Sequence, residues 1–172
     1  MPRVLSLKVA VYLLFWLAVD LCFGSLLEIK TAKPIFLYLM VTYAAFQWEA
    51  SKILPMAVAC GILRDLAGTH PFGLETCVLF FASAVLEFLV HKIDREFPIV
   101  RLAATFLFLL CVLTMILLVS RILGFYANIS WGAFWIALGT AFYTTCLSPI
   151  FFLVTSYWFH DKLRLKQYEL FK

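Results

Sequence analysis

Long runs of apolar residues, separated by short polar breaks, dominate the pattern along the chain. The breaks include EIKTAK, EASK, HKIDREFP and RILGFYANIS. A helix of about 20 apolar residues is long enough to cross the hydrocarbon core of a bilayer. The pattern therefore predicts six helices, at about residues 9–27, 34–48, 53–67, 72–90, 99–120 and 131–159.

Three of these runs differ in length from an ordinary membrane span. The runs at 34–48 and 53–67 are short, so each is expected to tilt, to enter the membrane only partway, or to be sheltered by its neighbours. The run at 131–159 is long and contains Pro149. Because proline lacks a backbone N–H, we expect it to kink this helix or to split off a piece at the membrane interface.

The composition agrees with a membrane setting. Of the 172 residues, 65% are hydrophobic and 14% are charged, whereas soluble domains carry about 25% charged residues. So few charges could hardly form the polar shell that water requires. We therefore predict an all-α integral membrane protein, with residues 1–172 forming a single transmembrane domain. The five cysteines lie inside apolar runs without metal-type spacing, so neither a metal site nor a disulfide framework is indicated.

Basic residues are distributed unevenly between the two sides of the predicted membrane. Cytoplasmic loops carry an excess of Lys and Arg, and ten of the 14 basic residues fall on the side that holds both chain ends. This predicts a multi-pass topology with both termini in the cytoplasm and a basic cytoplasmic tail at 160–172. The tail could be an ordinary anchor, could lie on the anionic inner leaflet, or could contact a partner.

Charged residues inside or beside the apolar runs are the candidate functional residues. A charge at the bilayer centre costs about 2.5–3.5 kcal/mol on insertion scales, so each one needs a reason. By depth, Asp20, Arg64, Asp65, His70 and Glu75 share one outer layer. Arg64 and Asp65 point about 100° apart on a helix, so each is expected to reach another helix. The preferred partner for Arg64 is Asp20 or Glu75.

Two interpretations of this outer layer stay open. It could join the first, third and fourth helices through paired charges and hydrogen bonds, which are common between membrane helices. Alternatively, it could line a cavity or a docking surface. No serine-nucleophile turn, HExxH or DxxD-type cluster is present, and the three histidines lie at different depths. We therefore predict a non-enzymatic protein without cofactor or metal, and without a role in binding nucleic acid.

The glycines of GILRDLAGTHPFG, residues 61–73, have backbone roles in this interpretation. Gly61 follows Ala57 at a small-xxx-small spacing that lets helices approach closely. Gly68 is expected to adopt the left-handed conformation that caps a helix. Gly73, with Pro71, is expected to shape a tight return into the next helix.

These residues resemble a known family, the rod shape-determining protein MreD. The stretch KPIFLYLMVTYAAFQWEASKILPMAVACGILRDLAGTHPFG has the family's basic-Pro start and its G-x3-D pattern with a further glycine, at Pro34, Gly61, Asp65 and Gly73. The stretch TTCLSPIFFLVTSYWFHDKLR resembles the family's closing helix, with Pro149 and a basic tail. Arg64 departs from the neutral polar residue that is more usual in the family.

The resemblance implies a fold and a function. The fold would be a six-helix bundle similar to the substrate-binding subunits of energy-coupling-factor transporters. The function would be that of a scaffold in the bacterial cell-elongation complex of the inner (cytoplasmic) membrane. It would bind MreC directly and work with MreB, RodA and a penicillin-binding transpeptidase to maintain cell shape during peptidoglycan synthesis. A vitamin-binding transporter subunit remains the alternative, and self-association stays open.

Overall fold

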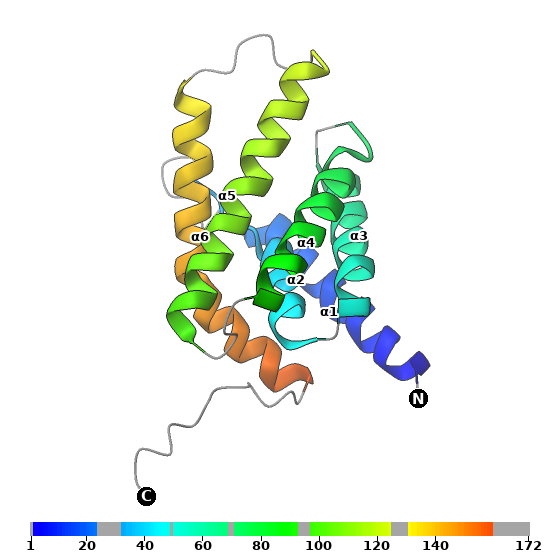
Figure 1. Ribbon diagram of the computed structural model, residues 1–172. Coiled ribbons are helices and arrows are strands. Elements are labelled where there is room, and N and C mark those ends of the chain that lie inside the picture. The colour runs from blue at the N-terminus through cyan, green and yellow to red at the C-terminus, as the bar shows by residue number, and fades with distance from the viewer. Residues whose placement is uncertain are drawn as a thin grey trace, which may run out of the picture.

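The chain folds into helices packed around a short central one. The computed structural model describes residues 2–23, 32–48, 50–68, 71–92, 97–124 and 131–159. Its helices confirm the prediction of an all-helical chain with six helices (Figure 1): α1 (Pro2–Phe23), α2 (Phe36–Gln47), α3 (Ala50–Ala67), α4 (Leu74–Lys92), α5 (Pro98–Ile122) and α6 (Trp131–Phe159). The predicted basic tail at 160–172 lies outside the described residues, as does the expected first segment beyond residue 23.

Proline positions account for several helix boundaries. The first helix begins at Pro2, earlier than expected, and α5 begins at Pro98. Proline suits the first helical position because its missing N–H has no partner there in any helix. The second helix begins at Phe36, later than the expected residue 34. Pro34 and Ile35 precede it as extended chain, and Ile35 has φ −123° and ψ 95°.

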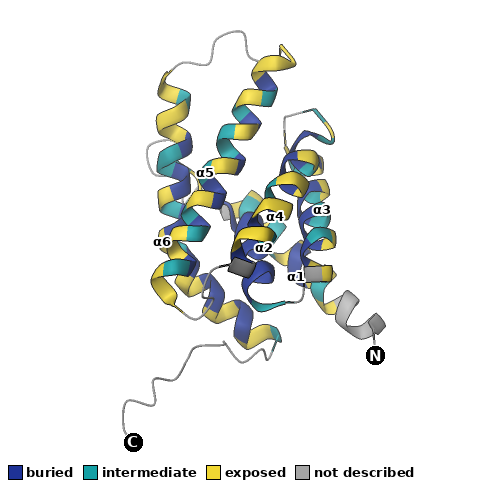
Figure 2. Ribbon diagram, viewed as in Figure 1, coloured by how far each residue is buried: buried dark blue, intermediate teal, exposed yellow. Residues whose placement is uncertain are grey.

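The shortest helix, α2, is the core of the molecule. Each of its residues from Phe36 to Phe46 is buried, as the dark blue of α2 in Figure 2 shows. This helix contacts all five other helices. Its 12 residues extend only about 18 Å at 1.5 Å per residue, less than the roughly 30 Å of a bilayer core. Of the three arrangements expected for this short run, shelter by neighbouring helices is the one that the structure contains.

Apolar side chains cover the outside of the bundle, while many polar ones lie inside it. Within the described residues, α5 and α6 are each long and apolar enough to cross a membrane. Large exposed apolar side chains occur on most helices, among them Phe15, Phe81, Phe88, Leu107 and Leu153. Buried polar or charged residues include Asp65, Glu75, Thr144 and Ser148. The interior is itself mostly apolar, so the exposed apolar side chains are the feature that sets this molecule apart from an ordinary soluble domain.

The last helix continues through its proline. It runs from Trp131 to Phe159 without interruption, and Figure 1 shows its second half running in a different direction from its first. Pro149 leaves the carbonyl of Thr145 without its helical N–H partner. The hydroxyl of Ser148 donates to that carbonyl at 2.7 Å. The helix therefore changes direction in its second half without being divided into two helices.

Both ends of the described chain lie at the same end of the molecule. Figure 1 places the start of α1 and the end of α6 together at the bottom of the view. The turn between α3 and α4 lies at the opposite end. An even number of helices joined by short connections produces this arrangement.

Candidate functional site: a polar network at two helix starts

Asp65 holds the first turn of α4. Its carboxylate accepts hydrogen bonds from the backbone N–H of Glu75 at 3.0 Å and of Thr76 at 3.1 Å, and from the Thr76 hydroxyl. The first N–H groups of a helix have no intrahelical acceptor, and the positive end of the helix dipole favours a negative charge. Asp65 is therefore a helix cap supplied by the preceding helix, and it is buried.

Two glycines make this contact sterically feasible. A Cβ atom on Gly61 would lie 2.5 Å from the Cα of Thr76, so α3 and α4 touch backbone to backbone at this point. One turn later on α3, Asp65 consequently reaches the α4 amides. Gly73 has φ +94° and accepts the N–H of Cys77 at 3.0 Å, which begins α4. The tight return predicted for Gly73 is present.

The left-handed conformation predicted for Gly68 is not observed there, because the glycines with positive φ among the described residues are Gly73 and Gly124. The N–H of Gly68 donates to the carbonyl of Arg64 at 2.7 Å, at the end of α3. The left-handed glycine of this turn is Gly73, which precedes α4.

Glu75 is the charge at the centre of the network. Its side chain is 1% exposed. One carboxylate oxygen accepts from Arg64 Nε at 3.1 Å and from the Tyr38 hydroxyl at 2.6 Å. The guanidinium of Arg64 also lies over the Tyr38 ring, 5.6 Å from its centre. Among the predicted partners of Arg64, Glu75 is confirmed.

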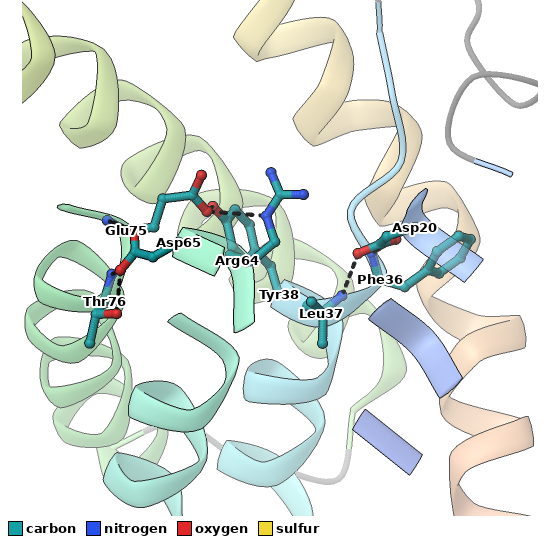
Figure 3. A network of polar contacts seen from close by, with 8 residues as sticks. All are labelled: Asp20, Phe36, Leu37, Tyr38, Arg64, Asp65, Glu75 and Thr76. Atoms are coloured by element: carbon teal, nitrogen blue, oxygen red, sulfur yellow. Dashed lines mark hydrogen bonds and ion pairs between the residues drawn. The ribbon is translucent and has the colours of Figure 1, made fainter. Parts of the chain in front are cut away.

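Asp20 contacts backbone rather than an arginine. Its carboxylate oxygens accept from the N–H groups of Phe36 at 3.1 Å and Leu37 at 3.4 Å. These are the first amides of α2, so Asp20 of α1 caps α2 as Asp65 of α3 caps α4 (Figure 3). Asp20 and Arg64 attract each other electrostatically, but among the described side chains they are not in direct ion-pair contact.

The network joins four helices where three were expected. Asp20 connects α1 to α2, Tyr38 connects α2 to α4, and Arg64 with Asp65 connects α3 to α4. The residues that sequence reasoning missed are Tyr38 and Thr76. Tyr38 sits in an unbroken apolar run, and no spacing sets it apart there. Its position in the first turn of α2 is the only signal that could have found it.

The remaining predicted residues lie beside the network or away from it, except His70, which lies outside the described residues. Pro34 is buried in the extended segment that leads into α2. Pro149 lies in the second half of α6, where the helix changes direction. Within the ranges that the structure describes, no three His, Cys, Asp or Glu side chains gather as a metal site would require.

A cavity of about 380 Å³ lies beyond the start of α2. The N–H of Ile35 donates to the Thr144 hydroxyl at 3.3 Å, so α2 begins opposite the middle of α6. The longer α5 and α6 continue past that point and form part of the cavity wall, together with Asp20 of α1, Arg64 of α3 and the segment before α2. Its polar lining consists of Asp20, Lys33, Arg64, Ser120 and Thr140, and its apolar walls include Leu113, Ile116, Leu117 and Ile136.

A second hollow, of about 540 Å³, lies between α4 and α5 and is almost wholly apolar. It begins at the Gly73 turn and continues along α4 past Phe81 and Val85, both of which are exposed. Across it stand Cys111 and Met115 of α5. We call this hollow the α4–α5 groove.

Comparisons of the chain with models of protein families, with curated proteins and with solved structures find no match.

Proposed function

We propose that the chain is an inner-membrane scaffold of the bacterial cell-elongation machinery, similar to MreD, which binds the single-span protein MreC. In this proposal it crosses the membrane with both termini in the cytoplasm and does no chemistry of its own. It links MreB filaments inside the cell to RodA and its transpeptidase partner. Its bundle is proposed to resemble the membrane subunits of energy-coupling-factor transporters.

The observation that carries the proposal is the joint role of the residues behind the resemblance. Gly61 permits the close crossing of α3 and α4, Asp65 caps α4, and Gly73 makes the turn between them. One pattern of three residues thus builds one structural unit, the α3–α4 hairpin. A family constrained to keep this hairpin would retain this pattern, which supports the resemblance beyond the loose spacing itself.

The surface of the bundle supports a membrane location. Exposed phenylalanines and leucines surround it, and the ionised groups of the network are turned inward onto helix amides and one another. A surface of exposed apolar side chains is compatible with contact to lipid, whereas soluble monomers rarely expose large apolar patches to water. Labelling tags at residues 1 and 172 in intact spheroplasts tests the topology. We expect both tags to be shielded until the membrane is permeabilised, and a tag exposed at either end contradicts the proposal.

The α4–α5 groove is the proposed seat of the MreC transmembrane helix. It borders the α3–α4 hairpin, is apolar, and exposes Phe81 and Val85. Filling it with Val85→Trp should reduce recovery of MreC in co-purification at least fivefold. Val154→Trp is the matched control, since Val154 is similarly exposed on α6. Equal MreC recovery with both variants would exclude the groove as the docking site.

A second function, that of a vitamin-binding subunit of an energy-coupling-factor transporter, is favoured by one observation. This is the cavity of about 380 Å³, whose lining combines charged, hydroxyl and apolar side chains. Its size is within the range of about 300–1,000 Å³ that is usual for small-molecule sites. Recovery of a vitamin with the purified protein, together with ATP-binding-cassette subunits, would support this function over the scaffold.

A further inference from the structure

Charged side chains line the cavity beyond α2 without being fully buried. The side chain of Arg64 is 24% exposed, Asp20 is partly exposed and Lys33 is exposed, and all three line the cavity. Arg64 uses Nε for Glu75, and Figure 3 shows its two terminal nitrogens pointing away from that carboxylate. One wall of the cavity is therefore polar, and whatever fills the cavity must be able to solvate charge.

The charges around the cavity balance. Arg64 and Lys33 are matched by Asp20 and by Glu75, which Arg64 contacts at 3.1 Å. Neither sign is in excess, so the cavity favours neither an anion nor a cation. Charged side chains within a membrane almost always face the protein interior or a water-filled cavity, because hydrocarbon cannot solvate them. Water is the medium that suits this wall.

The cavity extends along α5 and α6 to the end of the bundle. Its lining reaches from Leu113 to Ser120 on α5 and from Thr140 to Ala133 on α6, which corresponds to about 10 Å at 1.5 Å per residue. Ala133 belongs to the first turn of α6, and Figure 1 places that turn at the end of the molecule opposite both termini. The volume of about 380 Å³ has room for on the order of ten water molecules at about 30 Å³ each.

We propose that this cavity is an aqueous vestibule, filled with water and open at the end of the bundle where α6 begins. Its water hydrates the terminal nitrogens of Arg64, which allows the Arg64–Glu75 ion pair to lie inside an apolar bundle. The α4–α5 groove differs, because it is larger but almost wholly apolar and therefore suits hydrocarbon or a partner helix. The inference rests on the membrane setting of the proposed function but on none of its protein partners.

Substituted cysteines and a water-soluble methanethiosulfonate reagent test the vestibule. The background retains Cys60, which is fully buried, and lacks the other four cysteines. The reagent attacks only thiolate, which forms in water and is disfavoured in apolar surroundings. Leu117 lines the cavity, whereas its neighbour Leu118 is exposed on α5 outside that lining. We expect Leu117→Cys to be modified at least tenfold faster than Leu118→Cys, and equal rates overturn the proposal.

A deeper pair of positions separates hydration from depth. Leu113 lines the cavity, and Met115 lines the α4–α5 groove two residues nearer the end of α5. Depth alone favours reaction at position 115, whereas the vestibule favours position 113. We expect Leu113→Cys to react at least tenfold faster than Met115→Cys. The reverse order, in variants that elute as single species in size-exclusion chromatography, contradicts the vestibule.

Reagents of opposite charge distinguish water from an ion-binding site. The anionic ethylsulfonate and the cationic ethyltrimethylammonium reagents, each normalised to its rate with a free thiol, should modify Leu117→Cys within about fivefold of each other. A larger preference for one sign overturns the charge-balanced vestibule and favours a bound ion.

Sealed spheroplasts report the topology separately from hydration. Faster modification of Leu117→Cys than of Leu118→Cys in sealed spheroplasts supports both the vestibule and its opening on the outer side. The same order of rates seen only after permeabilisation supports the vestibule but contradicts the topology of the proposed function. Similar rates of the two variants in both preparations overturn the vestibule.

Discussion

Removal of the Asp65 carboxylate should open the α3–α4 hairpin. In Asp65→Ala, the backbone N–H groups of Glu75 and Thr76 and the Thr76 hydroxyl all lose their acceptor. The site is buried, so water cannot readily replace the lost bonds. The substitution therefore removes the cap of the α4 amides, while the Glu75 side chain keeps Arg64 and Tyr38 as partners.

The cost can be bounded from these contacts. Losing a helix cap costs about 0.5–2 kcal/mol, and each hydrogen bond to a charged group contributes about 1.5–3 kcal/mol. Bonds in one network do not add, so the estimate lies between the cap value and the sum of three bonds. We expect Asp65→Ala to lower the free energy of opening by about 3 kcal/mol. At about 1.4 kcal/mol per factor of ten, the population of the open hairpin rises roughly a hundredfold.

A cysteine already in the chain reports this opening. Cys60 of α3 is fully buried, one turn before Arg64. In a background without the other four cysteines, its alkylation rate in micelles measures how often the hairpin opens when reclosing is fast. The other four are exposed and can be replaced at little cost: Cys22, Cys77, Cys111 and Cys146.

The variants should follow a fixed order. Asp65→Ala should raise the alkylation rate of Cys60 roughly a hundredfold, and Asp65→Asn, which keeps one acceptor oxygen, about tenfold. Glu87→Gln is the control, because it neutralises a carboxylate on α4 away from the hairpin turn, and it should stay close to the unmodified chain. If Asp65→Ala alkylates no faster than Glu87→Gln, the capping role assigned to Asp65 is refuted.

Three further predictions concern the same bundle. Gly61→Ala should raise the alkylation rate of Cys60 at least tenfold, because its Cβ would lie 2.5 Å from the α4 backbone and overpacking costs about 1–3 kcal/mol. The control is Gly139→Ala, whose Cβ meets only a side chain at 3.7 Å and which should leave the rate unchanged or lower. Equal effects of the two substitutions would contradict the close crossing of α3 and α4. Tyr38→Phe removes the hydroxyl from Glu75 and should lower the thermal midpoint in micelles by an amount that corresponds to about 1–3 kcal/mol; an unchanged midpoint would mean that this bond is dispensable. Asp20→Ala should speed hydrogen exchange at the first amides of α2, measured by mass spectrometry, and exchange rates like those of the unmodified chain would argue against the cap.

Apolar run length and charge placement were sufficient to predict the helices and part of the network. The six apolar runs correspond to six helices. Arg64 and Asp65 point in different directions on α3, and each contacts another helix, as predicted. The common depth limited the predicted partners of Arg64 to Asp20 or Glu75, and the structure has Glu75. Depth alone could not choose between the two carboxylates.

Backbone partners could not be predicted in the same way. Asp20 and Asp65 bind helix amides, and an amide has no signature in the sequence. The central position of α2 was hidden for a related reason, because a helix that is apolar all round shows no preferred face. The left-handed glycine was expected at Gly68 and found at Gly73, since any glycine in a turn can adopt that conformation.

Affinity purification of the tagged chain from native membranes, followed by mass spectrometry, is the most direct test of the scaffold proposal. We predict that MreC is recovered in near-stoichiometric amount, accompanied by RodA and a penicillin-binding transpeptidase. Recovery of ATP-binding-cassette subunits in place of MreC would contradict the proposal and assign the chain to transport.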